Sequence, residues 1–214
     1  MKTKTTAWAV MVAVLVACMG VDAAPIRQPN VAANQNAWAD YWNKTTTHGN
    51  SDIIVSGNST AGYIGYVQYD LRGWTCPVGQ DVYAVFARFT VTGTVPSSGH
   101  VYAHQANSNT WEASTLNWNN QPGYVSVPLT SVAPAFQIYL DVTNLFNNRI
   151  GDYMSIALSS DTPSTNYYAG ILHASKDYPP VLEIFTIPVP EPSSIVPLVA
   201  GIMSLSALWA RHRR

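Results

Sequence analysis

The chain has 214 residues and a formal net charge of −1, and only 11% of its residues are charged. Globular proteins typically have about 25% charged residues, so this composition is typical of an exported β-protein with a polar but weakly charged surface. Between residues 24 and 188 there are six Lys and Arg residues and ten Asp and Glu residues. This mildly acidic balance argues against a surface that binds the phosphates of a nucleic acid. The length of this part of the chain suits one domain with a real core.

The N-terminus has the pattern of a secretory signal peptide. Lys2 and Lys4 precede an apolar segment, residues 7–17, which is too short to span a membrane comfortably. Small side chains near the end of this region predict cleavage after Ala23, which would remove residues 1–23. A second interpretation stays open, because the four residues ending at Cys18 also resemble a lipobox, in which Cys18 would become a lipidated N-terminus.

The next part of the chain contains short segments in which apolar and polar residues alternate. In residues 82–92, Val85, Ala87 and Phe89 lie on one face of a predicted strand and Arg88 lies on the other. This period of two is the pattern of a half-buried strand. Further strands, separated by turns rich in Gly, Pro, Ser and Asn, are expected at residues 37–42, 53–56, 63–71, 101–105, 126–129, 136–142, 155–158 and 181–187.

This series of short strands predicts an all-β fold, an antiparallel β-sandwich of the jelly-roll type, over residues 37–187. Residues 24–36 form a polar N-terminal segment to which we assign no element, and only residues 143–149 are expected to form a helical turn. Outside the two ends of the chain, no segment has a sustained helical period.

The most informative internal stretch is residues 111–122, with the sequence WEASTLNWNNQP. Its residues hydrogen-bond readily to their own backbone, which indicates a long irregular connection, and Trp111 and Trp118 could pin that connection onto the core. This stretch resembles the Trp-Glu…Ser-x-x-Trp-Asn-x-x-Pro segment of DNRLRE-type domains. Four other segments resemble motifs of the same family in the same order, at residues 39–42, 66–71, 141–145 and 179–182.

The resemblance covers residues 39–186. It implies a jelly-roll domain of a group that includes carbohydrate-binding modules attached to polysaccharide-degrading enzymes. Catalysis is not expected in this chain, because a glycosidase needs two carboxylates facing each other across a cleft and the acidic residues are scattered along the sequence. His100 and His104 lie four residues apart on a predicted strand, roughly 13 Å at the usual rise per residue, too far to share one zinc ion. We expect no catalytic residues, no metal site and no cofactor, although calcium stays possible.

Binding of a polysaccharide needs flat apolar faces for sugar rings, surrounded by polar groups. If the outward-facing residues of neighbouring strands line one concave surface, five residues are candidates for a ligand-binding groove, with an aromatic ring at its edge. An arginine in this groove would suit an acidic polysaccharide. The alternative is that the second sheet or loops cover these residues. The candidates are Trp42, Tyr66, Arg88, Tyr102 and His104.

The C-terminal segment, residues 188–214, has three parts in a fixed order. Val189, Pro190, Glu191 and Pro192 precede an apolar run at residues 195–210, and the chain ends with a basic cluster. A helix of this length is slightly short for a bilayer core, and the terminal cations would stay cytoplasmic. The order of the parts resembles the PEP-CTERM sorting signal, which implies recognition and removal of the tail by an exosortase-type protease. The basic residues of the cluster include Arg211, Arg213 and Arg214.

Both ends therefore predict export through the inner membrane to the cell surface, the outer envelope or the extracellular matrix, although an ordinary membrane anchor is an alternative for the tail. Three functions stay open. The first is a non-catalytic, surface-sorted protein of an exopolysaccharide-producing bacterium that binds polysaccharide. The second is a structural protein of the envelope or biofilm matrix without a specific glycan ligand. The third is a polysaccharide-acting enzyme, which the scattered acidic residues disfavour.

Overall fold

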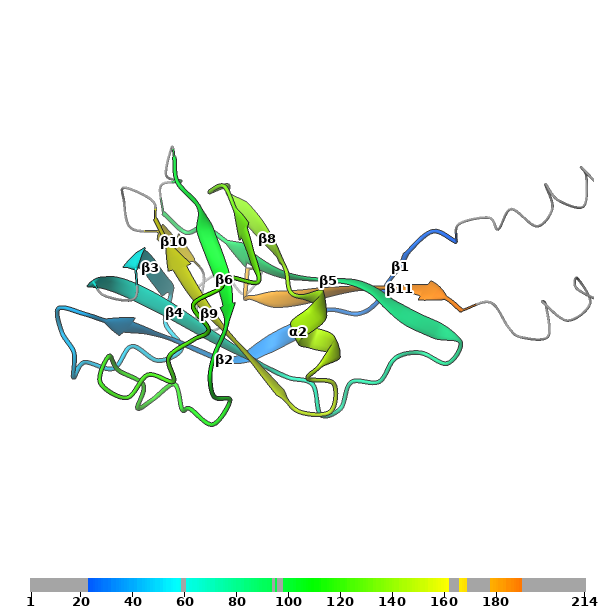
Figure 1. The fold of residues 1–214 in the computed structure, drawn as a ribbon, viewed down its shortest axis with the longest axis horizontal. Helices are drawn as coiled ribbons and strands as arrows, with labels where there is room; N and C mark the ends of the chain where they lie inside the picture. The colour runs from blue at the N-terminus through cyan, green and yellow to red at the C-terminus, as the bar shows by residue number, and fades with distance from the viewer. Residues whose placement is uncertain are drawn as a thin grey trace, which may run out of the picture.

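The computed structural model describes residues 23–58, 61–93, 95, 98–161, 166–168 and 178–189. Within them it contains eleven strands and one short helix (Figure 1). The strands are β1 (Ile26–Arg27), β2 (Val31–Asp40), β3 (Ile53–Asn58), β4 (Ala61–Asp70), β5 (Gln80–Thr90), β6 (Val101–Gln105), β7 (Thr130–Val132), β8 (Gln137–Asp141), β9 (Tyr153–Ser160), β10 (Asn166–Tyr168) and β11 (Val181–Pro188), and helix α2 spans Thr143–Asn147.

Eight strands form one hydrogen-bonded path in the order β7-β6-β9-β4-β2-β11-β5-β8. All paired neighbours are antiparallel, and the path curls into a nearly closed, barrel-like sheet with a jelly-roll-like form (Figure 1). β1 pairs with β11, and β3 joins β4 to β10. The prediction of an all-β antiparallel fold is confirmed. The strands form a single curled sheet, because β2 connects the two parts that would otherwise be separate.

The first two residues of β2, Val31 and Ala32, pair with β11, whereas its residues from Ala33 onward pair with β4. The register shifts between Ala33 and Gln35, where the strand passes from one neighbour to the other. We call β6, β9, β4 and the later part of β2 the covered half of the sheet, and β11, β5 and β8 the open half. The difference between the halves lies on their outer faces.

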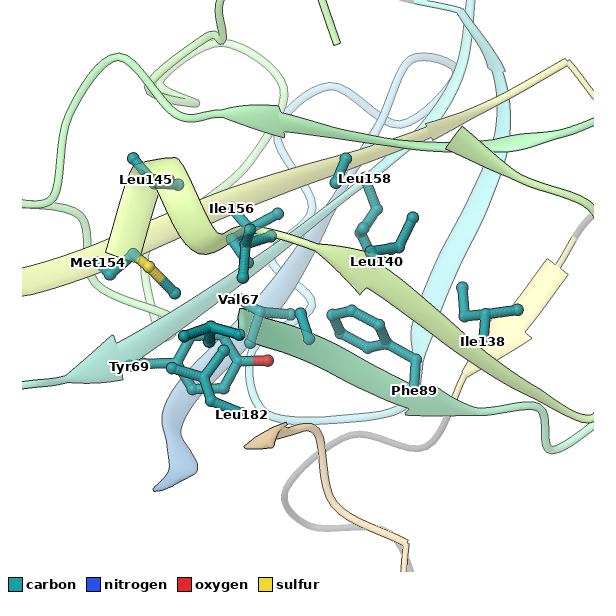
Figure 2. Close-up of a cluster of buried hydrophobic side chains, with 14 of the residues drawn as sticks. Val67, Tyr69, Phe89, Ile138, Leu140, Leu145, Met154, Ile156, Leu158 and Leu182 are labelled. Carbon is teal, nitrogen blue, oxygen red and sulfur yellow. The ribbon is translucent and has the colours of Figure 1, made fainter. Parts of the chain in front are cut away.

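The main core lies between the inner faces of the two halves (Figure 2). On β5 the predicted alternation is confirmed, because Val85, Ala87 and Phe89 are fully buried while Arg88 between them stays partly exposed. Each fully buried side chain of this size contributes about 1.5–3 kcal/mol. Residues from the facing strands and helix α2 complete the cluster and include Val67, Tyr69, Ile138, Leu140, Leu145, Met154, Ile156, Leu158 and Leu182.

A second apolar cluster lies on the outer face of the covered half, under the long connection of residues 106–124. Trp111 and Leu116 of this connection pack there with Tyr66 of β4 and Ala157 of β9. β9 is therefore buried on both faces, which explains why seven of its eight residues are buried and its burial does not alternate.

Side chains of the sheet form hydrogen bonds with the connection. Gln35 Nε2 donates to the carbonyl of Trp111 at 2.7 Å, and the N–H of Ala113 donates back to Gln35 Oε1 at 2.9 Å. Gln68 Nε2 donates to the carbonyl of Asn109 at 2.7 Å, and the Trp111 indole N–H donates to Ser155 Oγ at 3.1 Å. The backbone of this irregular segment thus finds partners in the sheet, as buried polar groups require.

Three strand assignments from the sequence need correction. Residues 126–129 are not a strand; the alternating Val127 and Leu129 are 72% and 37% exposed, and Pro128 has no N–H to donate to a ladder. The strand in this region is β7, which follows directly. Strand β10 was not predicted, and β1 and the first part of β2 lie in residues 24–36, where no element was expected.

Most of the two predicted targeting segments lie outside the described residues. This applies to residues 1–22, including Cys18, and to residues 190–214, including the apolar run and the arginines. Ala23 and Val189 are the outermost described residues. Within the described ranges, no helix is long and apolar enough to cross a membrane.

Candidate functional site

An open hollow of about 540 Å³ lies on the outer face of the covered half. Strands β4, β6 and β9 form its floor, and residues 121–128, which comprise the end of the covering connection and the residues after it, form its other wall. Its lining combines aromatic rings with amides and hydroxyls. The lining residues are Ile64, Tyr102, His104, Asn107, Gln121, Gly123, Tyr124, Ser126, Pro128 and Ser159.

His104 lies between the two tyrosine rings of the hollow. Its ring centroid is 4.5 Å from that of Tyr124 and 6.4 Å from that of Tyr102. Its Nδ1–H donates to the carbonyl of Val125 at 3.0 Å, so Nε2 accepts the hydroxyl hydrogen of Ser159 at 2.9 Å. Burial lowers the pKa of His104, so the ring is neutral at neutral pH.

The hydroxyl of Tyr102 donates to Asp161 Oδ2 at 2.7 Å. This bond raises the pKa of Tyr102 and, together with the N–H of His100, lowers the pKa of Asp161. The tyrosine ring is therefore held by its outer end, next to a carboxylate that is ionised at neutral pH. A carboxylate at this rim can accept hydrogen bonds from hydroxyl donors.

Gln121 presents its amide to the hollow and is held from behind. Its Oε1 accepts from the hydroxyl of Tyr66 at 2.7 Å, and its Nε2 donates to the carbonyl of Trp118 at 3.3 Å. Tyr66 itself is fully buried beneath the connection, and the centroid of its ring is 6.1 Å from that of Trp111. Burial raises the pKa of Tyr66. Tyr66 therefore positions a lining residue and does not line the hollow.

Trp42 is 61% exposed and belongs to a row of aromatic rings. The ring centroid of Trp42 is 5.2 Å from that of Tyr63 and 5.8 Å from that of Tyr41, and the centroids of Tyr41 and Trp118 are 5.3 Å apart. The backbone carbonyl of Trp118 accepts from the amide of Gln121 at the wall of the hollow. Trp42 thus offers an exposed flat apolar face outside the hollow's lining.

Arg88 lies elsewhere, on the outer face of the open half. Its Nη1 is 3.5 Å from Glu183 Oε1, and Arg27 Nη2 is 2.8 Å from the same oxygen. The side chain of Glu183 is only 9% exposed, so both cations neutralise a nearly buried carboxylate. The five residues predicted from the sequence therefore do not line one groove. Tyr102 and His104 line the hollow, Trp42 is exposed but is not a lining residue, Tyr66 lies beneath the connection, and Arg88 is on the other half of the sheet.

The alternation of β4 places Tyr66 on an outer face but does not show that the 106–124 connection covers that face. Sequence reasoning also missed Gln121 and Tyr124 as lining residues. The signal that could have found them is their place on either side of the Pro122-Gly123 turn, where Gly123 has φ of +66°.

Within the described ranges, no group of three or more His, Cys, Asp or Glu side chains could hold a metal ion.

The barrel-like antiparallel sheet, with a jelly-roll-like form, defines the class of protein as an all-β domain. The chain belongs to carbohydrate-binding module family 96, whose sequence model matches residues 28–186. Membership of this family suggests non-catalytic carbohydrate binding, and no enzyme family matches. The carbohydrate-binding-module part of the sequence resemblance is confirmed. No curated protein matches the chain.

Proposed function

We propose that this protein binds a polysaccharide, without catalysis, at the hollow of the covered half. The observation that carries the proposal is the arrangement of Tyr102, His104 and Tyr124 as three neighbouring rings next to the amide of Gln121. Aromatic faces pack against the C–H face of a pyranose, and planar amides and hydroxyls pair with its hydroxyl groups.

The site is held in place before any ligand arrives. Ser159 and the carbonyl of Val125 fix His104, Asp161 holds Tyr102, and Tyr66 holds Gln121. Groups already held in their binding orientation lose little conformational entropy on binding. A rigid site of this kind suits recognition.

The test is a binding screen of the purified full chain against neutral and acidic polysaccharides, with and without calcium, followed by calorimetry on the best ligand. Tyr124→Ala should weaken binding at least about tenfold, about 1.4 kcal/mol. The matched control is Tyr139→Ala, because Tyr139 is 43% exposed on the open half and outside the hollow. Equal affinities of the two variants would refute this site. Absence of binding to every polysaccharide would favour the structural envelope or matrix role.

The localisation of the protein is part of the proposal and rests on the sequence of the two ends of the chain. The N-terminal pattern supports export with cleavage after Ala23, and the order Val189-Pro190-Glu191-Pro192, apolar run and arginine cluster supports PEP-CTERM-type sorting by an exosortase. The tail would hold the protein at the inner membrane until processing. The mature module would then reach the cell surface, the outer envelope or the extracellular matrix.

Mass spectrometry of the mature protein tests this proposed processing and localisation. Loss of the residues that follow the Pro-Glu-Pro motif is expected, and Glu191→Ala should leave the unprocessed chain in the inner membrane. Cys18→Ser separates the two N-terminal alternatives, because it abolishes a lipid-sized mass only if Cys18 is lipidated. Recovery of the uncleaved chain in the cytosol would overturn the proposal.

A further inference from the structure

Exposed aliphatic side chains surround the point at which the C-terminal segment leaves the domain. β11 is paired with β5 through its last residue, and the N–H of Val189 then donates to the carbonyl of Gly79 at 2.9 Å. Ile26 of β1 pairs with Thr186 of β11, so β1 begins where β11 ends, at the right of Figure 1. Val78, which precedes Gly79, is fully exposed, and Ile26 and Val189 are each 41% exposed.

Val78 belongs to the loop between β4 and β5, which the rest of the domain holds in place. The ring of Trp74 in this loop packs against Phe146 of helix α2, with the two centroids 4.8 Å apart. At the end of the loop, the N–H of Gln80 donates to the carbonyl of Pro77 at 3.1 Å. Val78 therefore projects into solvent from a loop that is fixed on both sides of it.

The sequence limits how far this end of the domain can lie from a membrane that holds the tail. Only residues 190–194 separate Val189 from the apolar run at residues 195–210. A chain spans at most about 3.6 Å per residue, so Val189 lies within about 22 Å of the start of that run. The layer of lipid headgroups takes up part of this distance once the run is inserted. Insertion of the tail therefore brings the end of the domain that carries Val78 next to the lipid surface.

A domain that is already tethered needs only a weak contact to take up one orientation. Aliphatic side chains gain free energy when they leave water for the boundary between lipid headgroups and acyl chains. A few such residues bind a membrane poorly by themselves. The tail, however, makes their contact intramolecular and gives it a high effective concentration. Val78, Ile26 and Val189 lie at the part of the domain that the tail brings nearest to the lipid.

From these observations we infer that the unprocessed chain rests on the membrane with the end formed by β1, β11 and the β4–β5 loop, and that Val78 contacts the lipid surface. The inference rests on the proposed insertion of the C-terminal tail and does not depend on glycan binding. It also orients the hollow. The connection of residues 106–124 lies at the lower left of Figure 1, at the other end of the molecule from the ends of β1 and β11. The hollow beside it therefore lies away from the lipid while the chain is anchored.

The experiment places the exported chain, residues 24–214, in phosphatidylcholine vesicles, with Cys76→Ser to remove the native thiol. An environment-sensitive fluorophore is attached at Val78→Cys or, as the matched control, at Ser114→Cys, an exposed position in the connection. Flotation with the vesicles first shows that the tail is inserted. The fluorophore at Val78→Cys should then shift its emission to the blue and lose most of its fluorescence when the vesicles contain nitroxide-labelled lipid. The fluorophore at Ser114→Cys should show neither change.

The outcomes separate this inference from the proposals on which the protein's function rests. Equal emission and equal quenching at the two positions, in vesicles that carry the chain, would overturn the inference and leave the insertion of the tail intact. Stronger quenching at Ser114→Cys would mean the opposite orientation and would overturn it as well. Failure of the chain to float with the vesicles would refute the insertion itself, and the inference with it. None of these results bears on the hollow, which the comparison of Tyr124→Ala with Tyr139→Ala tests separately.

Discussion

The hydroxyl of Tyr66 donates a 2.7 Å hydrogen bond to Oε1 of Gln121, which joins the interior of the covered half to the wall of the hollow. Tyr66 is fully buried, so this bond fixes the orientation of a partly exposed amide from a rigid position. With Oε1 engaged, Nε2 of Gln121 points toward the carbonyl of Trp118. The relationship makes Tyr66 a positioning residue.

Tyr66→Phe removes this bond and keeps the ring. We expect glycan affinity to fall about three- to tenfold, because the Gln121 amide is no longer held in one orientation, and stability to fall by about 0.5–1.5 kcal/mol. Calorimetry and urea unfolding measure the two effects. An affinity equal to that of the unmodified protein would show that the orientation of Gln121 does not matter for binding.

Tyr69→Phe is the matched change on the same strand and should act in the opposite direction. Tyr69 is fully buried in the main core, and its hydroxyl has no hydrogen-bond partner among the described residues. Burying an unpaired hydroxyl costs free energy, so its removal should raise the free energy of unfolding by about 1 kcal/mol. Glycan affinity should not change. A clear loss of stability would mean that this hydroxyl is hydrogen-bonded in solution.

Gly49→Ala should loosen the connection over the covered half. A Cβ at Gly49 would overlap the carbonyl of Ala113, which belongs to that connection. We expect a loss of about 1–3 kcal/mol in stability, and faster amide hydrogen exchange in residues 106–124. Gly73→Ala is the control, because a Cβ there meets nothing within 4 Å. Equal stability of the two variants would contradict the close packing of the connection at Gly49.

Acidification should destabilise the fold through its buried histidines. Burial lowers the pKa of His104, and it also lowers the pKa of His48, where the charge of Asp40 partly opposes the effect. In the unfolded chain a histidine titrates near pH 6.5. As the pH falls through that value, the unfolded chain takes up protons that the native fold resists, so the free energy of unfolding decreases.

Urea unfolding at about pH 7.5 and about pH 5 measures this decrease. His104→Gln should show a smaller decrease in the free energy of unfolding than the unmodified protein, because it lacks one of the two histidines whose protonation the native fold opposes. The rim carboxylate Asp161 has a lowered pKa, so it stays ionised across this interval. An identical pH dependence in the variant would show that His104 does not contribute.

The strand pattern could be predicted wherever one face of a strand is buried and the other is not. β5 is the clearest case, because its core residues alternate with Arg88. The alternation of apolar and polar residues wrongly predicted a strand at residues 126–129, where the apolar side chains are exposed to solvent. Sequence alternation gives the two faces of a segment but not which of them the rest of the fold covers.

For the candidate site, the residue types were found but not their arrangement. Tyr102 and His104 line the hollow, whereas Tyr66 has the same outward alternation and is buried by a connection far along the chain. The side chain of Arg88 points outward from its strand as predicted by the alternation, but it lies on the open half and pairs with Glu183 there. These outcomes depend on contacts between residues far apart in the chain.

The sequence by itself determined the all-β class, most of the strands and the family-like motifs, because these depend on local alternation and turn chemistry. Only the tertiary structure decided that β2 joins two halves into one curled sheet and that residues 106–124 cover one outer face. The physical reason is that the exposure of a strand face depends on which distant segment packs against it.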